Sequence, residues 1–252
     1  MPAPDGWASS PKPNDEQLRC ANYSSNEWRV TLDGERLQIR LDTKQDHQDP
    51  LPPQVRSRNV AVGSKGDRHV IPVNDGWLVG INVGEFGGGL WWFSADGDRN
   101  RKLSDENVVG FANTSRGVLV FVGLAHMSLD DGKVLRVTDG TAGDRKLEVL
   151  VDLGSAPAAF AVESPDAVIV ITTTALVRVR TSAHVETLFK TEYDALYPNS
   201  ITLSSSGLVH IGMRHFVTRL TPTESTYKEE WFVPTNCTKF TIRDYDCVCA
   251  PG

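Results

Sequence analysis

Histidine side chains are the first candidates for acid–base or metal chemistry in this sequence. His126 and His215 both lie in predicted loops, where an imidazole can exchange a proton or bind a metal ion. Neither belongs to a spaced motif such as H-E-x-x-H, and no G-x-S-x-G turn presents a nucleophilic serine. The acidic segment 96–100 resembles part of a calcium loop, but it lacks the closing glutamate and fits a hairpin turn better. We therefore favour a protein without enzymatic activity.

Four cysteines form the second candidate group. Cys20 stands near the N-terminus, and Cys237, Cys247 and Cys249 cluster near the C-terminus. An even number of cysteines in an exported chain favours two disulfides that tie the chain ends together. A zinc site built on the three C-terminal cysteines is an alternative, although structural zinc sites usually use C-x₂₋₄-C pairs. Free thiols are the third interpretation.

Composition and the N-terminal segment suggest the class of protein and its compartment. The chain has 252 residues, a formal net charge of −6 and 40% hydrophobic residues, which is typical of a folded globular protein and argues against a nucleic-acid binder. No stretch approaches the roughly 18 apolar residues that a transmembrane helix needs. Residues 1–15 are rich in Pro, Ser and Asp and show no signal peptide as written. They look like the start of a mature chain after a leader, so we expect a periplasmic or extracellular protein, with a lipid anchor in the precursor left open.

The structural elements that must position these side chains recur along the sequence as a repeat. Polar turns end at Gly76, Gly117, Asp166 and Gly207, which are 41, 49 and 41 residues apart. Each turn is followed by an apolar, mostly β-branched run of about five residues, as expected of a strand buried on both faces. Alternating strands come next, such as 176–180, whose arginines we expect to face outward and whose valines to face inward.

Four strands per unit of 41 to 49 residues predict an all-β fold, a β-propeller. Four full units run from about residue 69 to 234. We expect a fifth blade of four antiparallel strands, in which the hairpin 28–41 around Asp33–Gly34 joins the strand 239–243 and closes the ring. The sequence thus predicts a flexible segment over 1–26 and one propeller domain over 27–249, with 42–66 as a long loop. A β-sandwich or two small β domains are the alternatives.

One segment carries a family resemblance. The run from Tyr197 to Gly212, YPNSITLSSSGLVHIG, resembles the inner-strand phrase of NHL and gluconolactonase-like propellers. In those enzymes a divalent metal sits at the top of the channel, held by Glu and Asn or Asp side chains. The resemblance implies Asn199 as a metal ligand, and no matching inner-strand glutamate or general-base aspartate accompanies it.

The predicted loops gather one set of candidate binding residues. In a propeller, the loops between second and third strands and the connections from one blade to the next share one face. Loops usually carry a protein's binding residues, and aromatic and arginine side chains dominate binding surfaces. The residues expected on this face are Glu85, Phe86, His126, Met127, Tyr197, Asn199, Arg214 and His215.

The sequence leads to three functional hypotheses. The first is a non-enzymatic propeller of the bacterial envelope that binds another protein through the loop face, in its most specific form an inhibitor or immunity-type protein. The second is a metal-dependent, lactonase-like hydrolase that uses Asn199. The third is a glycan-binding lectin. We expect no cofactor under the first hypothesis, and a divalent cation such as calcium under the second.

Overall fold

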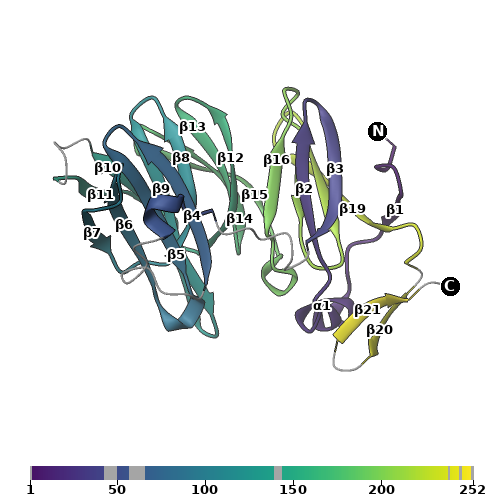
Figure 1. Cartoon of the computed structure of the whole chain (residues 1–252). Coiled ribbons are helices and arrows are strands. Elements are labelled where there is room, and N and C mark those ends of the chain that lie inside the picture. The colour runs from purple at the N-terminus through teal and green to yellow at the C-terminus, as the bar shows by residue number, and fades with distance from the viewer. Residues whose placement is uncertain are drawn as a thin grey trace.

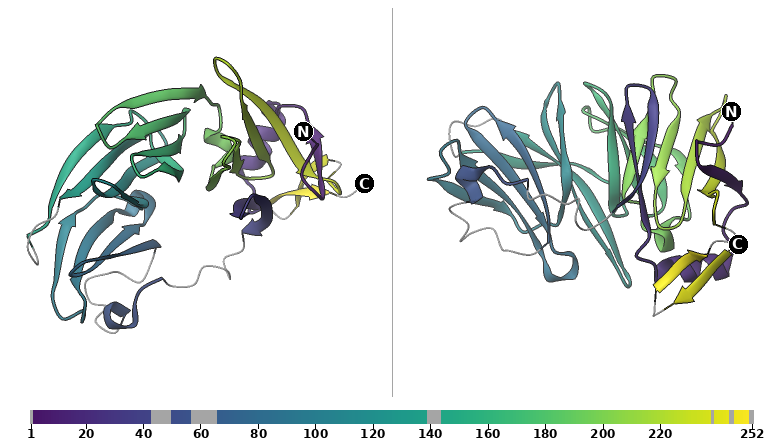
Figure 2. Two further views of the ribbon diagram at one scale, coloured as in Figure 1. Left: turned by 90° about the horizontal axis from the view of Figure 1, so that it is seen from above. Right: turned by 45° about the vertical axis from the view of Figure 1, so that its right-hand side comes forward.

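The structure is a computed structural model that describes residues 2–42, 50–56, 66–138, 144–237, 239–243 and 246–250. Its main part is a series of four antiparallel sheets, each containing four strands that are consecutive in the sequence. The sheets stand side by side around an arc in chain order (Figures 1 and 2). The all-β, propeller-like repeat predicted from the turn spacing is confirmed.

The strand bounds follow the predicted units. The first sheet contains β4 (Asp67–Val73), β5 (Gly76–Asn82), β6 (Gly88–Ser94) and β7 (Asn100–Ser104). The second contains β8 (Val108–Thr114), β9 (Gly117–His126), β10 (Leu129–Thr138) and β11 (Lys146–Asp152). The third contains β12 (Pro157–Ser164), β13 (Ala167–Thr172), β14 (Ala175–Arg180) and β15 (Val185–Lys190). The fourth contains β16 (Ser200–Leu203), β17 (Val209–Gly212), β18 (Val217–Pro222) and β19 (Tyr227–Pro234).

Apolar side chains between neighbouring sheets form the core. Strand β8 contacts β4 and β5, strand β12 contacts β8, and β16 contacts β12. Every residue of β13 and of β17 is buried, because these second strands have packed neighbours on both faces. Trp92 is 3% exposed and packs in the core shared by the first two sheets, whereas Trp91 on the same strand packs against a separate cluster. The two tryptophans therefore point to opposite faces, as strand alternation predicts.

Arginines recur at the same register in three sheets. Each stands opposite a glutamate on the neighbouring fourth strand, in the pairs Arg136–Glu148, Arg178–Glu186 and Arg219–Glu230. We expected these arginines to face outward, but the side chains of Arg178 and Arg219 are only 20% and 4% exposed. A carboxylate compensates the desolvation of each guanidinium, with Arg178 Nε 2.7 Å from Glu163 and Arg219 Nε 3.1 Å from Glu230.

The two ends of the chain do not form a common fifth blade. Strands β2 (Glu27–Asp33) and β3 (Arg36–Asp42) form a two-stranded sheet, and β2 contacts β16 and β17. Strand β20 (Lys239–Arg243) pairs with β21 (Asp246–Ala250), and among the described residues no pairing joins this hairpin to β2 or β3. The sequence analysis missed β21. Because β21 follows β20 after a short connection, pairing between them closes a smaller loop than pairing with the N-terminal hairpin would.

The N-terminal 26 residues, expected to be flexible, contain strand β1 (Trp7–Ser10) and helix α1 (Asp15–Asn22). Strand β1 pairs with β19 and so adds a fifth strand to the edge of the fourth sheet. Trp7 is 9% exposed and meets the ring of Trp28 edge-on, with centroids 4.9 Å apart. Helix α1 begins at a capping box, in which Asn14 and Gln17 each accept a hydrogen bond from the other's backbone N–H.

The four cysteines form two disulfides, as predicted, but only one of the two ties the chain ends together. Cys20–Cys247 joins α1 to β21, and Cys237–Cys249 ties the segment after β19 to the same strand. Figure 2 shows α1 and the C-terminal hairpin at the same end of the molecule.

The loop expected over 42–66 is described only in part. Helix α2 (Pro53–Arg56) lies within it, and Leu51 and Val55 are buried in a cluster with Val79 and Phe93 of the first sheet. In the parts of the chain that the structure describes, no helix is long and apolar enough to cross a membrane.

Candidate binding face

Neighbouring loops are linked along the face expected to bind. The side-chain amide of Asn107, between the first two sheets, donates to the Gly84 carbonyl at 3.0 Å. Asp130, near the start of β10, accepts from the Ala156 backbone N–H at 2.7 Å and from the Thr173 hydroxyl at 2.6 Å. The turns between the second and third strands of a sheet and the connections from one sheet to the next therefore meet at one edge of the sheets. There they are joined by hydrogen bonds.

Four of the predicted residues form what we call the tip cluster: Glu85, Phe86, His126 and Met127. The short 3-10 helix η2 (Gly84–Phe86) contacts β9 and leaves the Phe86 side chain 83% exposed. Met127 is 94% exposed at the turn between β9 and β10. Its backbone has a positive φ of 53°, a conformation that non-glycine residues seldom adopt outside tight turns.

The tip cluster stands on a longer hairpin than expected. We predicted that His126 lies in a loop, but β9 continues to His126 and β10 starts at Leu129. Gly123 lies opposite Gly132 in this paired stretch, and a Cβ on either glycine would come within 2.7 Å of the ring of Pro157, so the two glycines allow β12 to approach the hairpin closely. The sequence pattern contained too few β-branched residues at these positions to predict strand.

An acid and an imidazole lie in the same cluster as the two exposed apolar side chains. Glu85 Oε2 is 2.8 Å from His126 Nε2, without the angle of a good hydrogen bond. Both side chains are close to half exposed, at 47% and 40%, so water screens the pair and it adds little stability. The tip cluster thus combines two large apolar groups with one acid and one imidazole, which suits recognition of a mixed surface.

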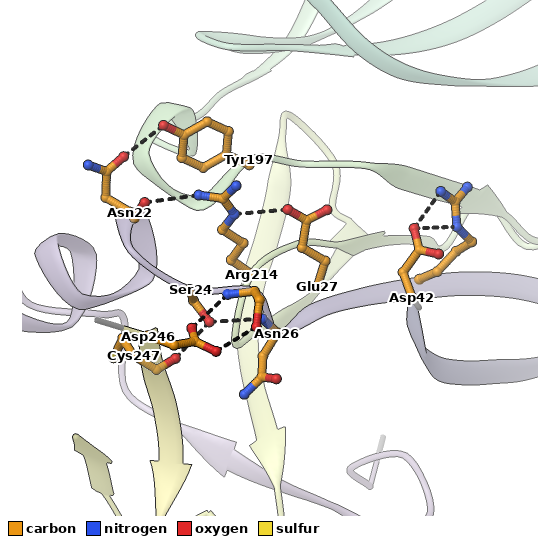
Figure 3. A network of polar contacts seen from close by, with 11 residues as sticks. Asn22, Ser24, Asn26, Glu27, Asp42, Tyr197, Arg214, Asp246 and Cys247 are labelled. Carbon is orange, nitrogen blue, oxygen red and sulfur yellow. Dashed lines mark hydrogen bonds and ion pairs between the residues drawn. The ribbon is translucent and has the colours of Figure 1, made fainter. Parts of the chain in front are cut away.

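Arg214 and Tyr197 belong to a second group on the fourth sheet, the Arg214 network, completed by Asn22 and Glu27 (Figure 3). Arg214 Nε lies 3.0 Å from the Glu27 carboxylate, and Nη1 donates to the Asn22 carbonyl at 3.0 Å. The guanidinium stacks on the Tyr197 ring, 3.7 Å from its centroid, and the Tyr197 hydroxyl donates to the Asn22 side chain at 2.7 Å. The Arg214 side chain is only 19% exposed. Through its contacts with Asn22 and Glu27, it fastens α1 and β2 to the fourth sheet.

The Arg214 network continues towards the C-terminal hairpin. Asp246 accepts from both the backbone N–H and the hydroxyl of Ser25, at 2.8 and 2.6 Å. The Ser24 hydroxyl donates to the Cys247 carbonyl at 2.8 Å and accepts from the Asn26 N–H at 2.9 Å (Figure 3). Sequence reasoning missed Asn22, Glu27 and Asp246, because no motif or spacing marks residues that meet only in the folded chain.

His215 is 1% exposed, so its side chain does not reach the exposed face. Burial lowers its pKa to about 4, nearby Asp246 opposes this shift, and the charge of Arg214 adds to it. The imidazole is therefore neutral near pH 7.

Asn199 is also committed to internal contacts. Its side-chain oxygen accepts from the Ser200 hydroxyl at 2.8 Å, and that hydroxyl accepts from the Val30 N–H at 2.9 Å. Calcium binds six to eight oxygen ligands. Among the described residues, no group of three acidic side chains converges to supply such a set. The residues around Asn199 therefore do not fit the divalent cation that the lactonase resemblance implies.

Comparisons with known proteins give fold similarity only. No family model matches the sequence, and no curated protein matches it. The structure is similar to one described as a 6-phosphogluconolactonase of Bacteroides uniformis, with a TM-score of 0.40 and 10% identity over 82% of this chain and 68% of the other. It is also similar to the N-terminal domain of Nup159, with a TM-score of 0.44 and 11% identity over 89% and 65%. A catalytically inactive virginiamycin B lyase of Staphylococcus aureus with quinupristin gives a TM-score of 0.38 and 13% identity over 92% and 90%.

Proposed function

We propose that this protein is a non-enzymatic, propeller-like protein of the bacterial envelope that binds another protein through the tip cluster. The observation that carries the proposal is the exposure of Phe86 and Met127, at 83% and 94%, on neighbouring loops joined by the Glu85–His126 pair.

Adjacent exposed apolar groups are a common feature of binding sites. Large aromatic side chains dominate the energy of protein interfaces, and methionine adapts its shape to a partner at low cost. Leu129, 51% exposed at the start of β10, extends the same apolar surface. The corresponding turn of the third sheet holds only Thr173 and Thr174. The tip cluster is therefore a single site, which suits one protein partner better than a ring of equivalent glycan pockets.

The two disulfides support the envelope part of the proposal. Disulfides form and persist in oxidising compartments such as the periplasm or the outside of the cell. A compact protein braced at both chain ends, with one apolar binding surface, suits the role of an inhibitor or immunity-type partner of a secreted protein.

Site-specific crosslinking tests the binding surface. A photoreactive amino acid replaces Phe86 or Met127 in one set of proteins and Val149 in the control, since Val149 is 65% exposed on the outer strand β11. We expect one host protein to crosslink at positions 86 and 127 and not at 149. With that protein purified, Phe86→Ala and Met127→Ala should each weaken binding by about tenfold or more, a loss of about 1.4 kcal/mol. Val149→Ala should leave the affinity unchanged. Equal crosslinking at all three positions, or unchanged affinity in both tip variants, would refute the proposal.

A further inference from the structure

A buried histidine lies against one of the two disulfides. Cys20 comes from α1, His215 from the connection between β17 and β18, and Cys247 from β21. The two sulfur atoms and a ring nitrogen of His215 all lie within 4.8 Å of one another. Among the residues that the structure describes, this is the only group of three or more Cys, His, Asp or Glu ligand atoms so close together.

The His215 imidazole has no hydrogen-bond partner of good geometry at either ring nitrogen among the described residues, although it is 1% exposed. The backbone of Cys247 interacts with it only weakly. The ring instead packs against Phe240, with centroids 4.4 Å apart. A buried polar group without partners costs folding free energy, so each such group calls for an explanation.

The backbone conformation of His215 costs further folding free energy. Its φ is +63°, a left-handed conformation that costs a non-glycine residue about 1 to 3 kcal/mol. The His215 N–H donates to the Asn26 carbonyl at 3.0 Å, and the Cys247 N–H donates to the Tyr23 carbonyl at 3.2 Å. The same segment, 23–26, thus positions both the histidine and the cysteine.

We propose that, when the Cys20–Cys247 disulfide is reduced, Cys20, Cys247 and His215 bind a zinc ion. Zinc prefers thiolate and imidazole ligands in a tetrahedral arrangement, about 2.3 Å from sulfur and about 2.0 Å from nitrogen. Two sulfurs bound to one such ion stand about 3.8 Å apart by tetrahedral geometry. All three ligand atoms are already within 4.8 Å, so only small side-chain movements are needed to surround the ion.

The reaction balances with a dithiol as the reductant. The dithiol gives two electrons and two protons to the disulfide, becomes a disulfide itself, and leaves Cys20 and Cys247 as thiols. Zinc then binds the two sulfurs and one ring nitrogen of His215, both thiols release their protons, and water fills the fourth position. The protein would therefore hold α1 to β21 by a covalent bond under oxidising conditions and by a metal ion under reducing ones.

Metal titration of the reduced full chain tests this site. A phosphine keeps the cysteines reduced without competing strongly for the metal, and Co²⁺ replaces Zn²⁺ because cobalt bound to thiolate has a charge-transfer absorption band. We expect one Co²⁺ per chain with this band, and a rise in Tm when Zn²⁺ is added. His215→Gln should weaken binding by more than about 100-fold, since even an outer-shell partner of a metal is worth about 10- to 100-fold. Zn²⁺ should then no longer raise the Tm.

Two controls separate this site from other metal binding. The double variant Cys237→Ser, Cys249→Ser removes the other disulfide and should bind Co²⁺ as tightly as the unmodified chain. The oxidised chain should show no charge-transfer band. If the reduced chain loses its native circular dichroism, Zn²⁺ should restore it, and should fail to do so in His215→Gln. Equal binding by His215→Gln, loss of binding in the double variant, or no recovery of a reduced, unfolded chain would overturn the proposal.

Discussion

His210 should make the protein less stable as the pH falls below neutrality. This residue lies on β17, opposite Arg219 on one side and Thr202 on the other, and is 6% exposed. Burial lowers its pKa to about 4 from an ordinary value of 6.5, and the positive charge of Arg219 adds to the shift. Glu230 forms an ion pair with Arg219 at 3.1 Å and offsets part of that charge.

The expected loss follows from the two pKa values of His210. The unfolded chain takes up a proton near pH 6.5, whereas the folded chain does so only near pH 4, so the unfolded state binds more protons between these values. The free energy of unfolding therefore falls as the pH falls through this window. The full shift corresponds to about 3 kcal/mol, of which about 2 kcal/mol is lost between pH 7 and pH 5.

Urea unfolding at pH 7 and pH 5, followed by tryptophan fluorescence, measures this loss in the wild type and in His210→Gln. The variant carries no titrating group at this position, so its free energy of unfolding should fall by about 2 kcal/mol less than that of the wild type. The hydrogen bond from Arg219 lowers the pKa of the Glu230 carboxylate from 4.5, so the contribution of Glu230 is lost mainly below pH 4.5 and does not disturb the comparison. An equal pH dependence in the two proteins would show that His210 is not held neutral by burial.

Two further predictions concern how the chain ends are fastened. Cys20–Cys247 closes 227 residues and Cys237–Cys249 closes 12, so the chain-entropy model predicts stabilisation of about 5 and about 3 kcal/mol. Paired serine variants in urea unfolding should therefore rank in that order, and the reverse order would contradict an entropic origin. Arg214→Ala should lower the free energy of unfolding by about 1 to 3 kcal/mol through its lost charged hydrogen bonds, with Arg214→Lys in between. An unchanged Tm in Arg214→Ala would mean that the network does not fasten α1 and β2.

Much of the fold was predictable because its signals are local and repeated. The turns ending at Gly76, Gly117, Asp166 and Gly207 precede β5, β9, β13 and β17 closely in the structure. Burial on both faces requires apolar, β-branched strands, so the second strand of each sheet stands out in the sequence. The hairpin around Asp33–Gly34 was predictable for the same reason, since its turn and both its strands are contiguous.

The residues of the candidate site were predictable only where a position in a loop makes a side chain exposed. Phe86 and Met127 lie at loop tips, and both side chains are exposed in the structure. Arg214 was expected on the same face, but its partners Glu27 and Asn22 stand 187 and 192 residues away. No periodicity links residues at such separations, so the sequence could not show that Arg214 is used internally.

By itself, the sequence determined the strands of the four consecutive sheets, the turns that precede their second strands and the four-strand repeat, because these depend on residues close together in the chain. Tertiary structure decided how the ends are used: β1 joins β19, and His215 meets Cys20 and Cys247. These outcomes depend on which strand edge is free and on which buried group is nearest in space. Such competition between distant segments is settled only when the whole chain packs.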